Sequence, residues 1–249
     1  MIKGIILSGD SDFAAEYNAV DTYETYGLAL AFDDFAVSAP QVRTDYKTIR
    51  GMDGVLDVSE APQGFPVFED RTIKWKMFKG PRPFMDWDIQ ELLALRTQFM
   101  ARWQGQRIRM IFPDDPDHYW VGRLSVGALE AGNGLFECEA RVYPYKLKNV
   151  NTEVTLADLS TAYKTYTLTN ERRFVVPEIT YTQEMYLQVL SGPVTVPPEV
   201  HLTLASGQLS NTVKLPDTLL MNGSISVKAK LAASAQDPYC LISYREGTF

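Results

Sequence analysis

The sequence is poor in the residues on which most enzymes and most small secreted scaffolds depend. It contains two cysteines and two histidines in 249 residues. Cys138 and Cys240 lie far apart and form no Cys-x-x-Cys pair. This excludes a zinc ribbon, a thioredoxin-type motif and a disulfide-stapled scaffold. Two buried free thiols are expected instead.

Long apolar runs are also missing. No stretch approaches the roughly 20 apolar residues that are needed to cross a bilayer. Near the start of the chain the apolar run is limited to Ile5, Ile6 and Leu7. A signal peptide needs an apolar region of about 7–15 residues, so secretion by that route is not expected.

Positive charge is in deficit. Lys and Arg together number 24 and Asp and Glu 31, which gives a formal net charge of −7. Such a chain has no general attraction to phosphate backbones, so nucleic-acid binding is not expected as its main activity. Lys74, Lys76 and Lys79 form a short basic stretch beside Trp75. A solvated strand face or a subunit contact is the favoured interpretation of this stretch.

Motifs for catalysis and cofactor binding are absent. The sequence contains no Gly-x-Ser-x-Gly elbow, no P-loop and no Gly-x-Gly-x-x-Gly. The densest polar cluster is Asp114, Asp115, Asp117 and His118, which is interspersed with Pro113 and Pro116 between two expected strands. Carboxylates with a histidine can hold a cation, but Asp and Pro also build turns between strands. A solvated turn is the favoured interpretation and a metal site the alternative.

Paired carboxylates leave one further enzymatic hypothesis open. Glu137 and Glu139 share one face of an expected strand. A glycosidase needs two carboxyls about 5–9 Å apart across a cleft, whereas two glutamates on a wet strand face need no such role. We therefore predict no catalytic residue, no cofactor and no metal site, and a protein that is not an enzyme.

What the sequence does contain is the alternation that is typical of β-strands. Ile73, Trp75 and Met77 alternate with polar residues, which predicts a strand with one wet face. Between residues 107 and 143, three such runs are separated by a Pro-Asp turn and an Asn-Gly pair. Because Asn-Gly is a strong hairpin signal, we expect a three-stranded meander.

One segment has the periodicity of a helix. Residues 88–104 carry apolar side chains at spacings of three and four, with Arg96 as the one charged member of the stripe. Asp88 and Glu91 are placed for a capping box, and Gly105 is placed to end the helix. A buried face is the favoured interpretation of the stripe, and a partner groove is the alternative.

Beyond residue 146 helical periodicity is hard to find, and short strands alternate with turns. Many short strands with regular turns favour a β-sandwich or jelly roll of about 100 residues. We therefore predict a mainly β protein of two domains. Residues 1–146 form a β-sandwich-like or barrel-like domain with one α-helix, and residues 147–249 form a second β-sandwich.

Two stretches resemble the distal tail protein (Dit) family of siphophage-type bacteriophages and prophages. The first stretch carries these elements in order: Gly27-Leu28, Pro40-Gln41-Val42, Gly51-Met52-Asp53-Gly54 with Leu56-Asp57, and the alternating strand Arg71–Phe78. The second is the carboxy-terminal Tyr244-Arg245-Glu246-Gly247. The order of elements agrees along most of residues 23–249, and residues 1–22 precede the pattern.

The resemblance implies a structural component of a phage tail tip or baseplate. Its amino-terminal domain would form a hexameric hub ring that stacks on the tail tube, and its carboxy-terminal domain would be galectin-like. The implied partners are other copies of the chain, the tail tube protein, the tape measure protein, and a tail-associated tip protein or receptor-binding protein. DNA would only pass through the channel, no membrane would be involved, and the location would be the tail tip of the virion.

Within such a ring, contacts between copies are expected on the segment 41–58 and the strand 72–80. Exposed strand edges supply natural material for contacts between neighbours in a ring. The residues predicted at this oligomer interface are Arg43, Arg50, Gly51, Asp53, Gly54, Lys74 and Lys76.

Two other functions stay open. A carbohydrate-binding module of galectin-like type is one, although the four tryptophans all lie in the first domain, which weakens stacking on sugars in the second. An enzyme acting on cell-wall glycans is the other.

Overall fold

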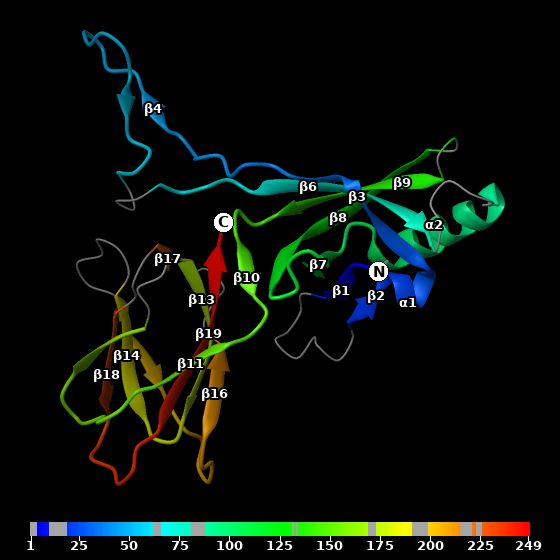
Figure 1. Cartoon of the computed structure of the whole chain (residues 1–249). Helices are drawn as coiled ribbons and strands as arrows, with labels where there is room; N and C mark the ends of the chain where they lie inside the picture. The colour runs from blue at the N-terminus through cyan, green and yellow to red at the C-terminus, as the bar shows by residue number, and fades with distance from the viewer. Residues whose placement is uncertain are drawn as a thin grey trace. The chain divides into compact units, whose positions relative to one another are not determined.

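The structure is a computed structural model, shown in Figure 1. It describes residues 4–9, 19–61, 66–80, 88–130, 132, 134–168, 173–190, 199–214, 221–222 and 226–249. Asn133 of the expected Asn-Gly turn lies outside the described residues.

Contacts divide the chain into two compact units. The first comprises Met1–Arg43, Phe68–Lys146 and Phe249, and the second comprises Thr44–Val67 and Leu147–Thr248. The domain ranges expected from the sequence, 1–146 and 147–249, stay a prediction. Each unit is described by itself.

The first unit is built on an antiparallel sheet. Its strands pair in the order β3-β6-β9-β8-β7-β1-β2. The bounds are β1 (Ile6–Gly9), β2 (Val20–Asp21), β3 (Leu28–Val37), β6 (Arg71–Lys79), β7 (Arg107–Ile111), β8 (His118–Glu130) and β9 (Leu135–Val142). The pairing of β7 with β8 and of β8 with β9 confirms the expected meander.

Alternation along these strands separates the core from the solvent. Ile73, Trp75 and Met77 of β6 are buried, as expected from their spacing. The same alternation holds in β9, which runs beside β6 (Figure 1) and buries Phe136 and Cys138. The inward side chains of β6 and β9 thus contribute to one hydrophobic core.

Helix α2 (Ile89–Trp103) confirms the expected helix to within a residue at each end. The Asp88 side chain caps it by accepting a hydrogen bond from the Gln90 N–H at 2.8 Å. Glu91 forms an ion pair with Lys79 of β6, where the sequence suggested a capping box. Leu92, Phe99 and Trp103 are buried, so a core face is the correct interpretation of this stripe.

The sequence favours an arm or a first irregular strand over residues 1–22 and predicts one helix, but the structure has a second helix, α1 (Thr22–Tyr26). Asp21 caps its first turn, and Gly27 ends it at a φ of 67°. The Thr22 hydroxyl accepts from the Ile5 N–H at 2.9 Å and donates to the Leu28 carbonyl at 3.0 Å. This buried residue therefore ties α1 to the chain on either side of it.

The second unit contains a two-stranded hairpin and a pair of sheets. The hairpin consists of β4 (Tyr46–Lys47) and β5 (Leu56–Asp57). Strand β10 (Lys146–Lys148) starts at the boundary between the units. The remaining strands are β11 (Thr152–Thr155), β12 (Lys164–Thr167), β13 (Arg173–Tyr181), β14 (Met185–Leu190), β15 (Glu199–Leu202), β16 (Asn211–Lys214), β17 (Met221–Asn222), β18 (Ser226–Leu231) and β19 (Cys240–Thr248).

Two antiparallel sheets enclose the core of this unit. One sheet has the order β12-β18-β14-β15. In the other sheet, β19 pairs with β11 and with β13, and β13 also pairs with β16 and β17. Leu187, Val227, Ile242 and Tyr244 are among the buried side chains that fill the space between them. The sequence favours two short strands over residues 174–176 and 178–182, but the structure has the single strand β13, whose pairing with β19 shifts register between Val175 and Glu178.

The fold is therefore mainly β, as the sequence predicts. No helix in the described ranges is long and apolar enough to span a membrane. The galectin-like character of the second domain stays a prediction.

Candidate assembly surfaces

The hairpin of residues 44–61, called the arm below, is held together by polar contacts within itself. The Val58 N–H donates to the Asp45 carbonyl at 2.9 Å, and the Asp45 N–H donates to the Ser59 hydroxyl at 2.8 Å. Hydrogen bonds from the hydroxyl and the N–H of Ser59 hold the pKa of Asp57 below its usual value. The arm thus keeps a defined shape without a core of its own.

The tip of the arm requires glycine. Gly51 and Gly54 have φ angles of 85° and 81°, in the left-handed region that other residues adopt at a cost. A Cβ at either position would meet no atom within 4 Å, so the constraint is backbone strain and not space. The two glycines around Met52-Asp53 favour a tight turn or bulge in the sequence, and the structure has a turn here.

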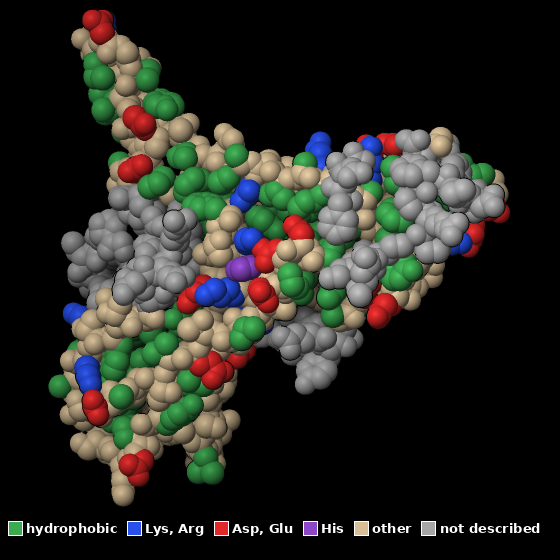
Figure 2. Space-filling view, in the orientation of Figure 1, with side chains coloured by type: hydrophobic (Ala, Val, Ile, Leu, Met, Phe, Trp, Pro, Cys, Tyr) green, Lys and Arg blue, Asp and Glu red, His purple; other side chains and the backbone are tan. Residues whose placement is uncertain are grey.

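The arm exposes several large hydrophobic side chains to solvent. Large hydrophobic side chains that are 41–55 % exposed recur along it and just before it: Val42, Tyr46, Ile49, Met52, Val55 and Leu56. Figure 2 shows hydrophobic side chains along the part of the chain that carries β4 in Figure 1. Exposed apolar patches that border polar residues commonly mark interaction sites.

The structure brings only some of the predicted interface residues together. Arg50, Gly51, Asp53 and Gly54 all belong to the tip of the arm, and Arg43 is exposed just before it. Their role at an interface stays a prediction.

Lys74 and Lys76 lie on β6 in the first unit, where both form ion pairs. Lys74 lies 3.3 Å from the Glu139 carboxylate, and Lys76 lies 2.8 Å from that of Glu130. The ion pair of Glu139 also explains one of the two glutamates that left a glycosidase open. The place of Lys74 and Lys76 at an interface likewise stays a prediction.

The acidic cluster after β7 forms a turn, as favoured. Asp115 Oδ1 lies 2.8 Å from His118 Nδ1, and the other oxygen accepts a hydrogen bond from Lys146. Desolvation raises the pKa of Asp115, but the hydrogen bonds and charges of Lys146 and His118 outweigh it and lower the pKa overall. Among the described residues, no three His, Cys, Asp or Glu side chains are grouped to hold a metal ion.

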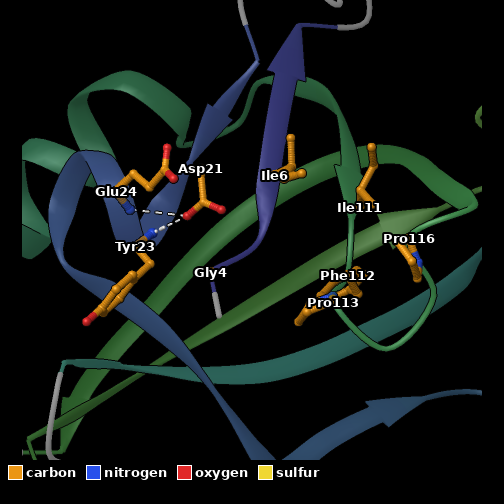
Figure 3. Close-up of a pocket in the computed structure, with 9 residues that line it drawn as sticks. All are labelled: Gly4, Ile6, Asp21, Tyr23, Glu24, Ile111, Phe112, Pro113 and Pro116. Atoms are coloured by element: carbon orange, nitrogen blue, oxygen red, sulfur yellow. Dashed lines mark hydrogen bonds between the residues drawn. The ribbon is translucent and has the colours of Figure 1, made fainter. Parts of the chain in front are cut away.

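A cavity of about 320 Å³ in the first unit was not expected from the sequence (Figure 3). Its walls come from β1, α1 and the turn after β7, and they include Ile6, Tyr23, Phe112 and Pro116. The Asp21 carboxylate at its edge already accepts hydrogen bonds from the Tyr23 and Glu24 N–H groups, at 2.7 and 3.2 Å. The lining of the cavity is mostly apolar.

Both cysteines are free and buried, as expected. Burial raises the pKa of the Cys138 thiol strongly, and it raises that of Cys240 to about 12. Neither side chain is therefore a reactive thiolate in the folded protein.

The fold is similar to that of a known phage protein. The similar structure is the crystal structure of the SPP1 Dit protein (gp 19.1), described as a paradigm of the hub adsorption apparatus in Gram-positive infecting phages. The two structures align over 99% of this chain and 100% of that chain, with a TM-score of 0.59 and 13% sequence identity. The chain therefore has the Dit fold, and the resemblance predicted from the sequence is confirmed at this level.

Other comparisons add no argument. A structure of infectious bursal disease virus Gx strain aligns with a TM-score of 0.22 and 9% identity, over 99% of this chain and 67% of that chain, which is too low to indicate a shared fold. No family model matches the chain, and no curated protein matches it significantly.

Proposed function

We propose that this chain is a structural component of a bacteriophage tail tip and forms a hexameric hub ring. The ring connects the tail tube to the apparatus that adsorbs to the host. The observation that carries the proposal is the similarity to the SPP1 Dit fold over nearly the whole of both chains.

The arm supports self-assembly. Its five exposed hydrophobic side chains, with Val42 just before it, would be removed from water on a neighbouring copy, and each Å² of apolar surface buried contributes about 25 cal/mol. Among the described residues its two short strands pair only with each other, so another chain can add to their outer edges. A projection on one copy that binds a different surface on the next is a heterologous contact, and such contacts close into rings.

The proposal includes the partners that a tail hub requires. These are the tail tube protein, the tape measure protein, and a tail-associated tip protein or receptor-binding protein. DNA passes through the central channel without specific binding, and the protein resides at the virion tail tip. Such a role is structural and involves no catalysis.

The mass of the purified chain in solution tests the proposal. Light scattering should give about six times the 28.1 kDa of one chain, and negative-stain images should show a ring with a central hole. A 28.1 kDa particle that stays monomeric both alone and with purified tail tube protein would contradict the proposal.

A variant of the arm tests whether the arm lies at the contact between copies in the ring. Changing Val55 and Leu56 to Ser should abolish the ring and leave the melting temperature of the monomer unchanged, because both side chains are already exposed. Leu209→Ser is the matched control, since Leu209 is 88 % exposed in another part of the second unit and should leave the ring intact. Rings of normal mass in the Val55 and Leu56 variant would remove the arm from the interface.

A carbohydrate-binding role is a second candidate. On the β12-β18-β14-β15 sheet, the rings of Tyr186 and His201 stack at 4.4 Å, and the Lys230 ammonium lies 4.8 Å from the Tyr186 ring. Aromatic and polar groups that alternate on an outward strand face suit a sugar. A glycan array probed with the chain and with Tyr186→Ala tests this role, and binding unaffected by that substitution would contradict a site at Tyr186.

A further inference from the structure

Three arginines lie side by side across the sheet of the first unit. Arg107 of β7 is directly opposite Arg123 of β8, and Arg123 is directly opposite Arg141 of β9. Neighbouring strands are about 4.8 Å apart, and like charges directly opposite one another destabilise a sheet. This set, called the arginine row below, therefore costs stability in the isolated chain, which itself carries a net charge of −7.

Contacts within the chain only partly offset this repulsion. Arg141 Nε pairs with the Asp70 carboxylate at 3.0 Å, and Arg107 donates to the Tyr143 hydroxyl at 2.6 Å. The central Arg123 donates to the Gly105 carbonyl at 2.9 Å, and no carboxylate in the described ranges pairs with it. Arg123 thus has positive charge on both sides and a neutral acceptor as its bonded partner.

The row borders a recess that can admit a ligand. All three arginines line a cavity of about 350 Å³ together with Asp70, Val142 and Tyr143. Each arginine is exposed. Guanidinium groups present donors in a planar fork that matches a carboxylate, so the recess favours ligands with carboxylate groups.

The same hairpin carries the complementary charge at its other end. The turn between β7 and β8 holds Asp114 and Asp117, both exposed and without a partner among the described residues. The Asp115 N–H donates to the Phe112 carbonyl at 3.1 Å, and Asp115 also bonds Lys146. Because the turn is already fixed, its two carboxylates lose little conformational freedom on binding.

The two ends of the hairpin cannot meet within one chain. Strand β7 spans Arg107–Ile111, and at about 3.4 Å per residue the acidic turn lies on the order of 15 Å or more from Arg107. A basic surface at one end and an acidic one at the other is the arrangement that joins copies head to tail in a ring.

We propose that the arginine row of one copy binds the Asp114 and Asp117 carboxylates of the next copy. The proposal rests on the ring proposed above and names a second contact within it, separate from the arm. Arg123 is the residue on which the contact depends most, because it gains its first carboxylate partner there.

Charge exchange tests the contact. Arg123→Glu alone, and Asp114→Arg with Asp117→Arg, should each raise the concentration at half-assembly about tenfold or more, measured by mass photometry at low salt. A chain that carries all three changes should recover part of the assembly, because the new carboxylate at position 123 can pair with the new guanidinium groups while Arg107 and Arg141 keep their charge. Lys228→Glu is the control, since it makes the same charge change in the other unit and should leave assembly unchanged.

The outcomes separate this contact from the ring itself. Rings that form normally in the Arg123→Glu chain, or a loss that the triple variant does not restore, would overturn the contact and leave the ring standing. A wild-type chain that never assembles would overturn both. An oligonucleotide shift that wild type gives and Arg123→Glu loses, together with normal rings, would assign the row to phosphate groups instead.

Discussion

The guanidinium of Arg96 donates two hydrogen bonds to the Gly127 carbonyl, from Nε at 2.9 Å and from Nη2 at 2.5 Å. Arg96 lies on α2, and Gly127 lies on β8 at the register shift between Val126 and Leu129. At this shift the regular hydrogen-bond pattern between β8 and β9 is interrupted, and Arg96 of α2 supplies the donor for the Gly127 carbonyl. This explains why a charged residue stands in the otherwise apolar stripe of α2.

Replacing Arg96 by Leu should destabilise the first unit by about 1–3 kcal/mol, because a part-buried carbonyl then loses its charged donor. Urea unfolding followed by tryptophan fluorescence measures the change. Arg102→Leu is the control, since Arg102 is exposed and lies over the Trp103 ring at 4.9 Å, a contact that contributes about 0.5–1 kcal/mol. An equal loss of unfolding free energy in the two variants would show that the hydrogen bonds to Gly127 contribute no stability.

Changing Gly51 and Gly54 together to Val should block ring assembly without lowering the melting temperature of the core. Each φ lies in the left-handed region, which costs a residue with a Cβ roughly 1–2 kcal/mol, so the tip of the arm must change shape. Light scattering reports the mass and calorimetry the melting temperature. Gly132→Val is the control, because that turn glycine has open space and no positive φ. Normal rings in the double variant would exclude a role for the turn.

The stability that Asp115 contributes should be lost in acid. Its folded pKa lies below the usual value of an aspartate, so its stabilising contribution is present above the unfolded pKa and is lost as pH falls through the folded pKa. Asp115→Asn should therefore flatten the fall in melting temperature between about pH 5 and about pH 2. Glu184→Gln, at an exposed carboxylate with no described side-chain partner, should leave the slope as it is. An unchanged slope in Asp115→Asn would contradict the prediction.

The two cysteines should resist thiol reagents while the protein is folded. Burial raises the pKa of both thiols, that of Cys240 to about 12, so neither supplies thiolate at pH 8. An Ellman assay should detect neither thiol in the native protein and both in guanidinium chloride. Rapid reaction of one thiol in the native protein would mean that its unit opens readily, and mass spectrometry of the labelled peptide would identify which one.

The local elements of the fold were largely predictable from the sequence. The alternation of Trp75 with its neighbours, the cap at Asp88 and the Gly51–Gly54 turn each depend on a few adjacent residues, and each is found as expected. Helix α1 was missed although Asp21 and Gly27 mark both of its ends, because five residues show no helical period. The sequence of residues 25–40 favours one or two strands joined by a turn, and the structure has one strand, β3, whose pairing with β6 shifts register between Ala31 and Ala36.

By itself the sequence determined that this protein is mainly β, that residues 88–104 contain a helix and that the resemblance is to a phage tail family. Only the tertiary structure decided what lies beside what. The arginine row depends on the register of three strands, in which Arg107, Arg123 and Arg141 come from positions far apart along the chain. The exposure of the arm's hydrophobic residues likewise depends on the absence of a covering element among the described residues. Alternation and capping are short-range effects that adjacent residues encode, whereas register and coverage follow from the packing of the whole chain.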